Sequence, residues 1–324
     1  MIVRRMLKIW LATSFPLVLM AGCGNGHGTA SGAGQAGAGG EASSETVVSD
    51  EPAPEAKCSV PTSQVIEVGQ TFWHSGFEVT LADATYTPAP PGCSGEFVIA
   101  ASFYNRGGGT ASLDTRMLLT AAGKDYRLVG RQDDIPSVPG KRTGKGFLRF
   151  TIDDMFDATQ ATLLVGSAGE HSATVPLGAD SPDTLRSLEP LDIVLTDSAK
   201  AGPLTFKMAG GYLRADEPAR HRTLATNDLN MVLFFGISAT SSENVYDDHF
   251  TLVLPDGTAV APDLAPIELT RAGATIDDLS VAFTVDAPAE GTYKLEIGGA
   301  WGPANEWTET EVPFDIETQP QFDQ

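Results

Sequence analysis

Residues 147–152 read FLRFTI, and apolar side chains at Leu148, Phe150 and Ile152 alternate with polar ones. A period of two is the pattern of a β-strand that buries one face. The stretch FEVTL at 77–81 alternates in the same way, and FVIAASFY at 97–104 predicts a longer strand. Further short apolar runs predict strands at residues 117–120, 124–126, 161–165 and 173–177. No long amphipathic helix is evident, so the chain from Cys58 onward predicts an all-β sandwich.

A second block of sequence repeats this order of strands and turns. Residues 204–208 correspond to 77–81, 230–237 to 97–104, 250–258 to 117–126, 280–285 to 147–152, and 292–297 to 161–165. We therefore predict two tandem sandwich domains, at residues 58–179 and 186–318, followed by a tail at 319–324. The alternative is one larger β-domain, which a chain of this length also allows.

The N-terminus has the layout of a secretory signal peptide. A basic segment at residues 4–8 precedes an apolar run at 9–20, and two small residues stand before Cys23. This arrangement resembles the lipobox of bacterial lipoproteins, in which the cysteine is lipidated, for example with palmitate, and becomes the new N-terminus. We therefore expect a signal peptide at 1–22 and a lipid bilayer as partner through Cys23. An ordinary signal peptide with an incidental cysteine, or an uncleaved anchor, remains open.

Residues 23–57 are rich in glycine, alanine and serine and contain almost no large apolar side chain. Such a segment cannot bury a core, so we expect a disordered linker. It would hold the folded part away from the membrane surface. The predicted location is extracytoplasmic, anchored at the cell envelope.

Two cysteines remain after Cys23, namely Cys58 and Cys93. An even pair outside the cytoplasm usually forms a disulfide. The loop between these cysteines is about 35 residues long, for which closure is worth roughly 3–4 kcal/mol. Two free thiols or half of a metal site are the alternatives.

The chain is strongly acidic, with 21 Lys and Arg against 42 Asp and Glu and a formal net charge of −21. This balance argues against nucleic acid as a partner, and against anionic lipid headgroups bound by charge. It is compatible with cationic ligands or divalent ions, although a solvated acidic surface is the commoner explanation.

Four stretches of the first block occur in a recognisable order: EVGQT at 67–71, NRG at 105–107, GKDY at 123–126, and VPGK with GKGF between 138 and 147. In this order they resemble a bacterial family of secreted immunoglobulin-like domains. The family groups uncharacterised lipoproteins with a mycobacterial immunoprotective antigen. The resemblance covers about residues 65–177. It implies Ig-like sandwiches and an exported location, but it brings no catalytic motif to transfer.

Catalytic signatures are missing from the sequence. No Gly-x-Ser-x-Gly stretch supplies a nucleophile, and none of the five histidines has metal-ligand spacing. We therefore expect no enzyme activity and no cofactor.

Acidic pairs fall at predicted loops, and Asp133, Asp134, Asp247 and Asp248 are weak candidates for a calcium site. Solvated turn carboxylates are the alternative.

Tryptophans offer a possible contact surface. Trp73 lies at the start of the first block, while Trp301 and Trp307 lie in or after a Gly/Pro-rich turn of the second. Exposed tryptophans on such loops can contact a protein or a sugar, although a core or edge-covering position is the more frequent outcome for tryptophan.

These observations lead to one functional hypothesis. We expect non-catalytic binding at the cell envelope, with an envelope protein or glycan as the partner. Three alternatives stay open: a structural spacer without ligand, a calcium-binding surface module, and an enzyme whose site is assembled across both domains. The last one predicts histidines and carboxylates that converge in a polar pocket.

Overall fold

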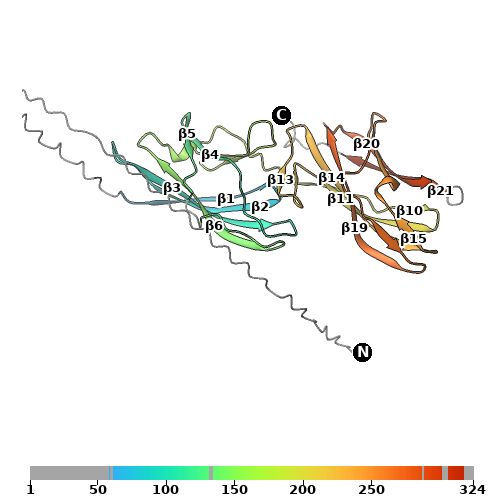
Figure 1. The fold of residues 1–324 in the computed structure, drawn as a ribbon. Coiled ribbons are helices and arrows are strands. Elements are labelled where there is room, and N and C mark those ends of the chain that lie inside the picture. Colours follow the sequence, from blue (N-terminus) through green and yellow to red (C-terminus); the bar gives the residue numbers. More distant parts are fainter. Residues whose placement is uncertain (1–57, 59–60, 131–133, 287, 301–305, 317–324) are drawn as a thin grey trace, which may run out of the picture. The chain divides into compact units, whose positions relative to one another are not determined.

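The computed structural model describes residue 58 and residues 61–130, 134–286, 288–300 and 306–316 (Figure 1). The predictions for the leader, Cys23, the linker, Asp133, Trp301 and the tail lie outside these residues. The described part is almost entirely antiparallel β-strand, so the all-β fold class is confirmed. Its helical segments are two three-residue 3-10 turns, η1 (Ala158–Gln160) and η2 (Asp247–His249). Neither could cross a membrane, and no other helix occurs among the described residues.

The N-terminal pair of sheets covers residues 64–176. One sheet has the order β1 (Gln64–His74), β2 (Phe77–Thr87), β3 (Gly95–Asn105), β6 (Thr143–Ile152). The other has the order β5 (Lys124–Arg127), β4 (Met117–Ala121), β7 (Thr162–Val165), β8 (Ala173–Pro176). Every second residue of β3 and β4 is buried, because one face of each sheet packs into the core.

The C-terminal pair covers residues 191–316. Its first sheet has the order β10 (Ser198–Ala201), β11 (Leu204–Arg214), β14 (Asp228–Ala239), β19 (Thr275–Asp286), and β9 (Leu191–Ile193) also pairs with β11. Its second has the order β17 (Ala259–Val260), β16 (Phe250–Val253), β20 (Gly291–Ala300), β21 (Glu306–Ile316). Two short ribbons complete it: β12 (Asp216–Glu217) with β13 (Arg222–Thr223), and β15 (Glu243–Val245) with β18 (Glu268–Thr270).

The two pairs of sheets repeat one strand order. In chain order, β1 to β8 of the first pair correspond to β10, β11, β14, β16, β17, β19, β20 and β21 of the second. All five correspondences drawn from the sequence connect strands at equivalent places in their sheets. Contacts nevertheless group Ala56–Gln324 as one compact unit. Independent domains, and the stricter immunoglobulin-like assignment, therefore stay predictions.

The repeat extends to a matching β-bulge. The pairing of β2 with β3 shifts register between Leu81 and Ala84, after the fifth residue of β2. The pairing of β11 with β14 shifts between Met208 and Gly211, again after the fifth residue. A bulge adds one residue to a strand and increases its local twist. Both halves therefore bend the same strand at the same place.

The predicted disulfide is confirmed. Cys58, which precedes β1, is bonded to Cys93 in the connection between β2 and β3, with a Cα–Cα distance of 6.2 Å. The bond closes a loop with a sequence separation of 35 and ties the start of the described chain to the first sheet.

Candidate functional site

The two pairs of sheets meet where the tip of the β1–β2 hairpin contacts the β12–β13 ribbon. The turn residues Ser75 and Gly76 both have positive φ, at 49° and 79°, which suits a tight two-residue hairpin. Gly76 N–H donates to Asp216 Oδ2 at 2.6 Å, and Ser75 N–H donates to Thr223 Oγ1 at 3.1 Å. A Cβ on Gly76 would lie 2.8 Å from Pro218 Cα. Only glycine therefore allows this close approach.

A buried ion pair stands at the centre of this junction. Arg214 Nε donates to Asp216 Oδ1 at 2.6 Å, and the side chains are only 3% and 5% exposed. The Arg214 guanidinium carbon also lies 5.5 Å from the centre of the Tyr212 ring. Removing a buried charge from water costs several kcal/mol, so each member of such a pair depends on its partner.

His74 is buried at the same junction and is 1% exposed. Its Nδ1 lies 3.0 Å from Ser75 Oγ and 3.1 Å from Thr223 Oγ1. Burial lowers the pKa of His74 from 6.5 to about 4, although the nearby charge of Asp216 acts in the opposite direction. The imidazole is therefore neutral at neutral pH.

We expect His74 to make the fold acid-sensitive. Its pKa is lower in the folded than in the unfolded chain, so the unfolded chain binds the proton first as the pH falls. The contribution of neutral His74 to the free energy of unfolding is fully present above pH 6.5. It decreases by about 3 kcal/mol between pH 6.5 and pH 4, at roughly 1.4 kcal/mol per pKa unit.

Denaturant unfolding of the wild type and of His74→Gln, followed from neutral pH to pH 4, measures this contribution. Burial also lowers the pKa of His171 and His249, so part of the slope should remain in the variant. An equal loss of stability with pH in both proteins would contradict the assignment to His74.

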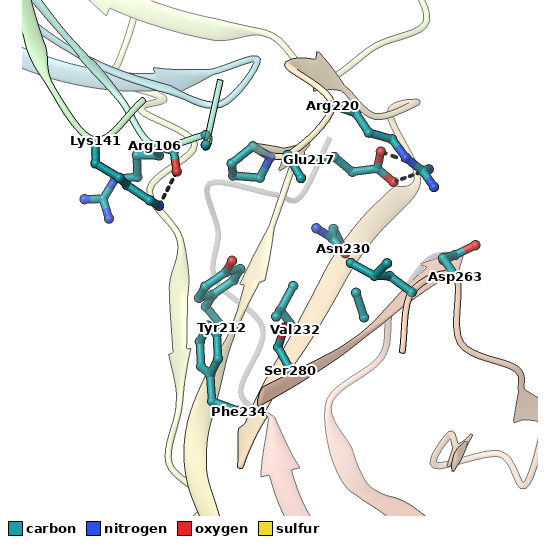
Figure 2. Close-up of a pocket in the computed structure, with 16 residues that line it drawn as sticks. Arg106, Lys141, Tyr212, Glu217, Arg220, Asn230, Val232, Phe234, Asp263 and Ser280 are labelled. Atoms are coloured by element: carbon teal, nitrogen blue, oxygen red, sulfur yellow. Dashed lines mark hydrogen bonds and ion pairs between the residues drawn. The ribbon is translucent and has the colours of Figure 1, made fainter. Parts of the chain in front are cut away.

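A cavity of about 330 Å³ opens beside the junction (Figure 2). Its floor is the outer face of the sheet that contains β11, β14 and β19. Tyr212 pairs with Val232, Val232 pairs with Ala282, and Phe234 pairs with Ser280, so all five side chains lie on one face. The Tyr212 and Phe234 rings meet edge to face with centroids 5.4 Å apart.

The apolar floor explains an unusual stretch of β14. Residues 231–235 read MVLFF and are apolar without interruption, whereas a strand with one solvated face alternates. Asn230 and Val232, on the outer face, are each only 7% exposed. A continuous apolar run is compatible with a strand that is covered on both faces, but FVIAA at 97–101 is equally apolar in β3, where only every second residue is buried, so the run alone does not identify the cavity.

Asn105, at the end of β3, holds the loops that form the facing wall. It is fully buried, and its Nδ2 donates to the carbonyl oxygens of Gly109 and Val138, each at 2.8 Å. Its Oδ1 accepts the Gly107 N–H at 2.8 Å. A Cβ on Gly107 would lie 2.6 Å from the Pro218 carbonyl oxygen, which explains the glycine at this position.

Five charged residues line the cavity: Arg106, Lys141, Glu217, Arg220 and Asp263. Arg106 forms an ion pair with Glu78, which lies outside the cavity, at 2.5 Å. Glu217 accepts hydrogen bonds from Arg222 Nε at 2.5 Å and from Arg220 Nη1 at 3.3 Å, and its pKa is lowered mainly by Arg222.

Lys141 differs from the other cations of the cavity. Its ammonium group donates to the Arg106 carbonyl oxygen, and no carboxylate of the described residues forms an ion pair with it. Figure 2 shows this group on the wall opposite Asp263.

Backbone strain concentrates in the segments that meet here. Positive φ values occur at six non-glycine residues of the described chain, and four of them lie in these segments: Ser75, Lys141, Leu188 and His221. Leu188 follows Ser187, whose carbonyl oxygen accepts the Trp73 N–H at 2.8 Å. Left-handed backbone costs roughly 1–2 kcal/mol per residue, so the surrounding contacts must stabilise it.

The described residues of the calcium hypothesis do not come together as a metal site. Asp134 accepts from Arg149 Nε at 3.0 Å, and Asp247 and Asp248 lie in η2, where Asp247 Oδ1 accepts the Asp248 N–H. Within the described ranges, no three carboxylate, imidazole or thiol groups are placed to hold a metal ion.

Of the tryptophans, Trp73 is half-buried in β1 and Trp307 belongs to β21. His74 and Asp216 both lie at the junction, but neither lines the described cavity, and the enzyme alternative stays a hypothesis.

No protein-family model matches the chain, and a search of curated proteins finds no relative. Among solved structures, a conserved hypothetical protein from Bacillus anthracis is 13% identical with a TM-score of 0.27, covering 35% of this chain and 96% of its own. A conserved domain protein from Bacillus anthracis is 10% identical with a TM-score of 0.23, covering 79% of this chain and 92% of its own. Likenesses of this size add nothing to the assignment of the site.

Proposed function

We propose that this chain is an extracytoplasmic lipoprotein, anchored through a lipidated Cys23, that binds a ligand without catalysis at the cell envelope. The observation that carries the binding role is the cavity of about 330 Å³ over the apolar outer face of β11, β14 and β19. Ligand sites are typically concave and mostly apolar, with a few polar groups that orient the ligand. The resemblance to secreted lipoproteins supports the location.

The anchor and the binding site can be tested separately. Cells that express the full chain and receive an alkyne fatty acid should label the wild type but not Cys23→Ala. The variant should also leave the membrane fraction. Labelling of Cys23→Ala at the wild-type level would contradict a lipid anchor at this cysteine.

For the cavity, we expect the full chain, purified from its own cells in mild detergent, to retain a compound that mass spectrometry detects. Phe234→Ala removes half of the aromatic pair on the floor and should reduce the retained amount by about tenfold, as for loss of an aromatic contact of 1–1.5 kcal/mol.

Phe147→Ala is the matched control, because Phe147 is 44% exposed and does not line this cavity. Equal retention by the wild type and Phe234→Ala would show that the compound binds elsewhere. If no compound is retained, the ligand role loses its support and the structural spacer becomes the better assignment.

A further inference from the structure

The chemistry of the cavity narrows the class of ligand, provided that the cavity is the binding site proposed above. The charged side chains that line the cavity are the first observation. Three cations and two carboxylates line the cavity of a chain with twice as many acidic as basic residues. Glu217 is neutralised by Arg220 and Arg222, and Asp263 Oδ2 accepts the Thr284 N–H at 2.5 Å. With the ion-pair partners Glu78 and Arg222 included, four cations lie beside three carboxylates here, so the cavity has a small excess of positive charge on a strongly negative protein.

Lys141 is the cation best placed to meet a ligand. It is exposed, and its backbone has a φ of 58° in the turn after Val138. The Lys141 N–H donates to the Asn105 carbonyl oxygen at 2.9 Å, so the same buried Asn105 that orders the wall also fixes this turn. With one hydrogen bond used on the Arg106 carbonyl, the ammonium group keeps further donors for an anion.

The floor favours a flat apolar body. Tyr212 and Phe234 present two rings, and Val232 and Ala282 continue the apolar surface. In Figure 2 Tyr212, Val232 and Phe234 lie below Lys141, while Asp263 lies on the opposite side of the cavity. A ligand with one charged end would therefore place a negative group near Lys141 and away from Asp263.

We propose that the cavity binds an amphipathic organic anion, whose aromatic or aliphatic body rests on Tyr212 and Phe234 and whose carboxylate or sulfonate contacts the Lys141 ammonium group. The apolar contacts supply most of the affinity, and Lys141 supplies the preference for an anion. The net negative charge of the whole protein would favour a cationic ligand, but the Lys141 ammonium group would repel one in this cavity.

Two fluorescent probes test the proposal on the full chain. Anilinonaphthalene sulfonate carries rings and an anion, and phenylnaphthylamine has the same ring system without the sulfonate. We expect one molecule of the anionic probe to bind per chain. Lys141→Met should weaken its binding about 2- to 5-fold and leave the neutral probe unchanged, as for loss of one exposed ion pair. Added salt should weaken only the anionic probe.

Matched variants separate the possible outcomes. Lys141→Arg should restore anion binding, and Lys200→Met, which removes an exposed lysine of β10, should change neither probe. If Phe234→Ala weakens both probes but Lys141→Met weakens neither, the cavity binds ligands without anion preference, and this inference is wrong while the proposed function stands. If Phe234→Ala weakens neither probe, or if neither probe binds, the cavity is not the site and both proposals are wrong.

Discussion

Replacing Asp216 with alanine should lower the free energy of unfolding by about 3–5 kcal/mol. The substitution leaves the Arg214 guanidinium buried without its counter-charge and removes the acceptor of the Gly76 N–H. Both losses act where the two pairs of sheets meet. For a folded part of this size, we expect the melting temperature to fall by roughly 10 °C, at about 2–4 °C per kcal/mol. Calorimetry and denaturant unfolding measure the two quantities.

Asp125→Ala is the matched control, because Asp125 is an exposed residue of β5 with no ion pair among the described residues. It should change the stability by less than about 0.5 kcal/mol. The double variant Arg214→Met, Asp216→Leu replaces the ion pair with apolar side chains and should recover much of the loss. A loss of less than about 1 kcal/mol in Asp216→Ala would contradict the buried pair.

Removal of the disulfide by Cys58→Ser with Cys93→Ser should cost about 3–4 kcal/mol, because the unfolded chain regains the freedom of a loop with a sequence separation of 35. Denaturant midpoints of the oxidised wild type and of the variant measure the difference. The wild type under reducing conditions should match the variant, which controls for the serine substitutions themselves. Equal midpoints for the oxidised and reduced wild type would show that the bond does not stabilise the fold.

The sequence predicts the strands of both halves because alternation is a local property. FEVTL at 77–81 and FLRFTI at 147–152 each show which face is buried without knowledge of the rest of the chain. Nine strands escape this reasoning: seven of them (β9, β10, β12, β13, β15, β17 and β18) have two to four residues, too few to show a period, and β1 and β21 escape for particular reasons. Gly69, with a φ of 61°, lies where β1 shifts register, and Pro313 interrupts the pattern of β21, which tolerates a proline because it is the last strand of its sheet.

The junction could not be predicted in this way. The contact between Gly76 and Asp216 joins residues 140 positions apart, and β12 and β13 have only two residues each. The partners of the acidic pairs could not be predicted either, because only the folded structure shows that Asp134 forms an ion pair with Arg149. The uninterrupted run at 231–235 does not identify the cavity either, because FVIAA at 97–101 is also uninterrupted and lies in a strand where only every second residue is buried.

The matching bulges of β2 and β11 make the two halves comparable residue by residue. In the C-terminal half, Tyr212, Val232 and Ala282 lie side by side across the sheet. The equivalent positions of the N-terminal half are Thr85, Val98 and Arg149. The protein thus contains its own reference surface, which has the same strand pairing but a mixed face of polar and apolar side chains. Tyr212 and Ala282 of the cavity floor thus stand where the first half has Thr85 and Arg149, and the neighbouring pair Phe234 and Ser280 stands where it has Ala100 and Phe147.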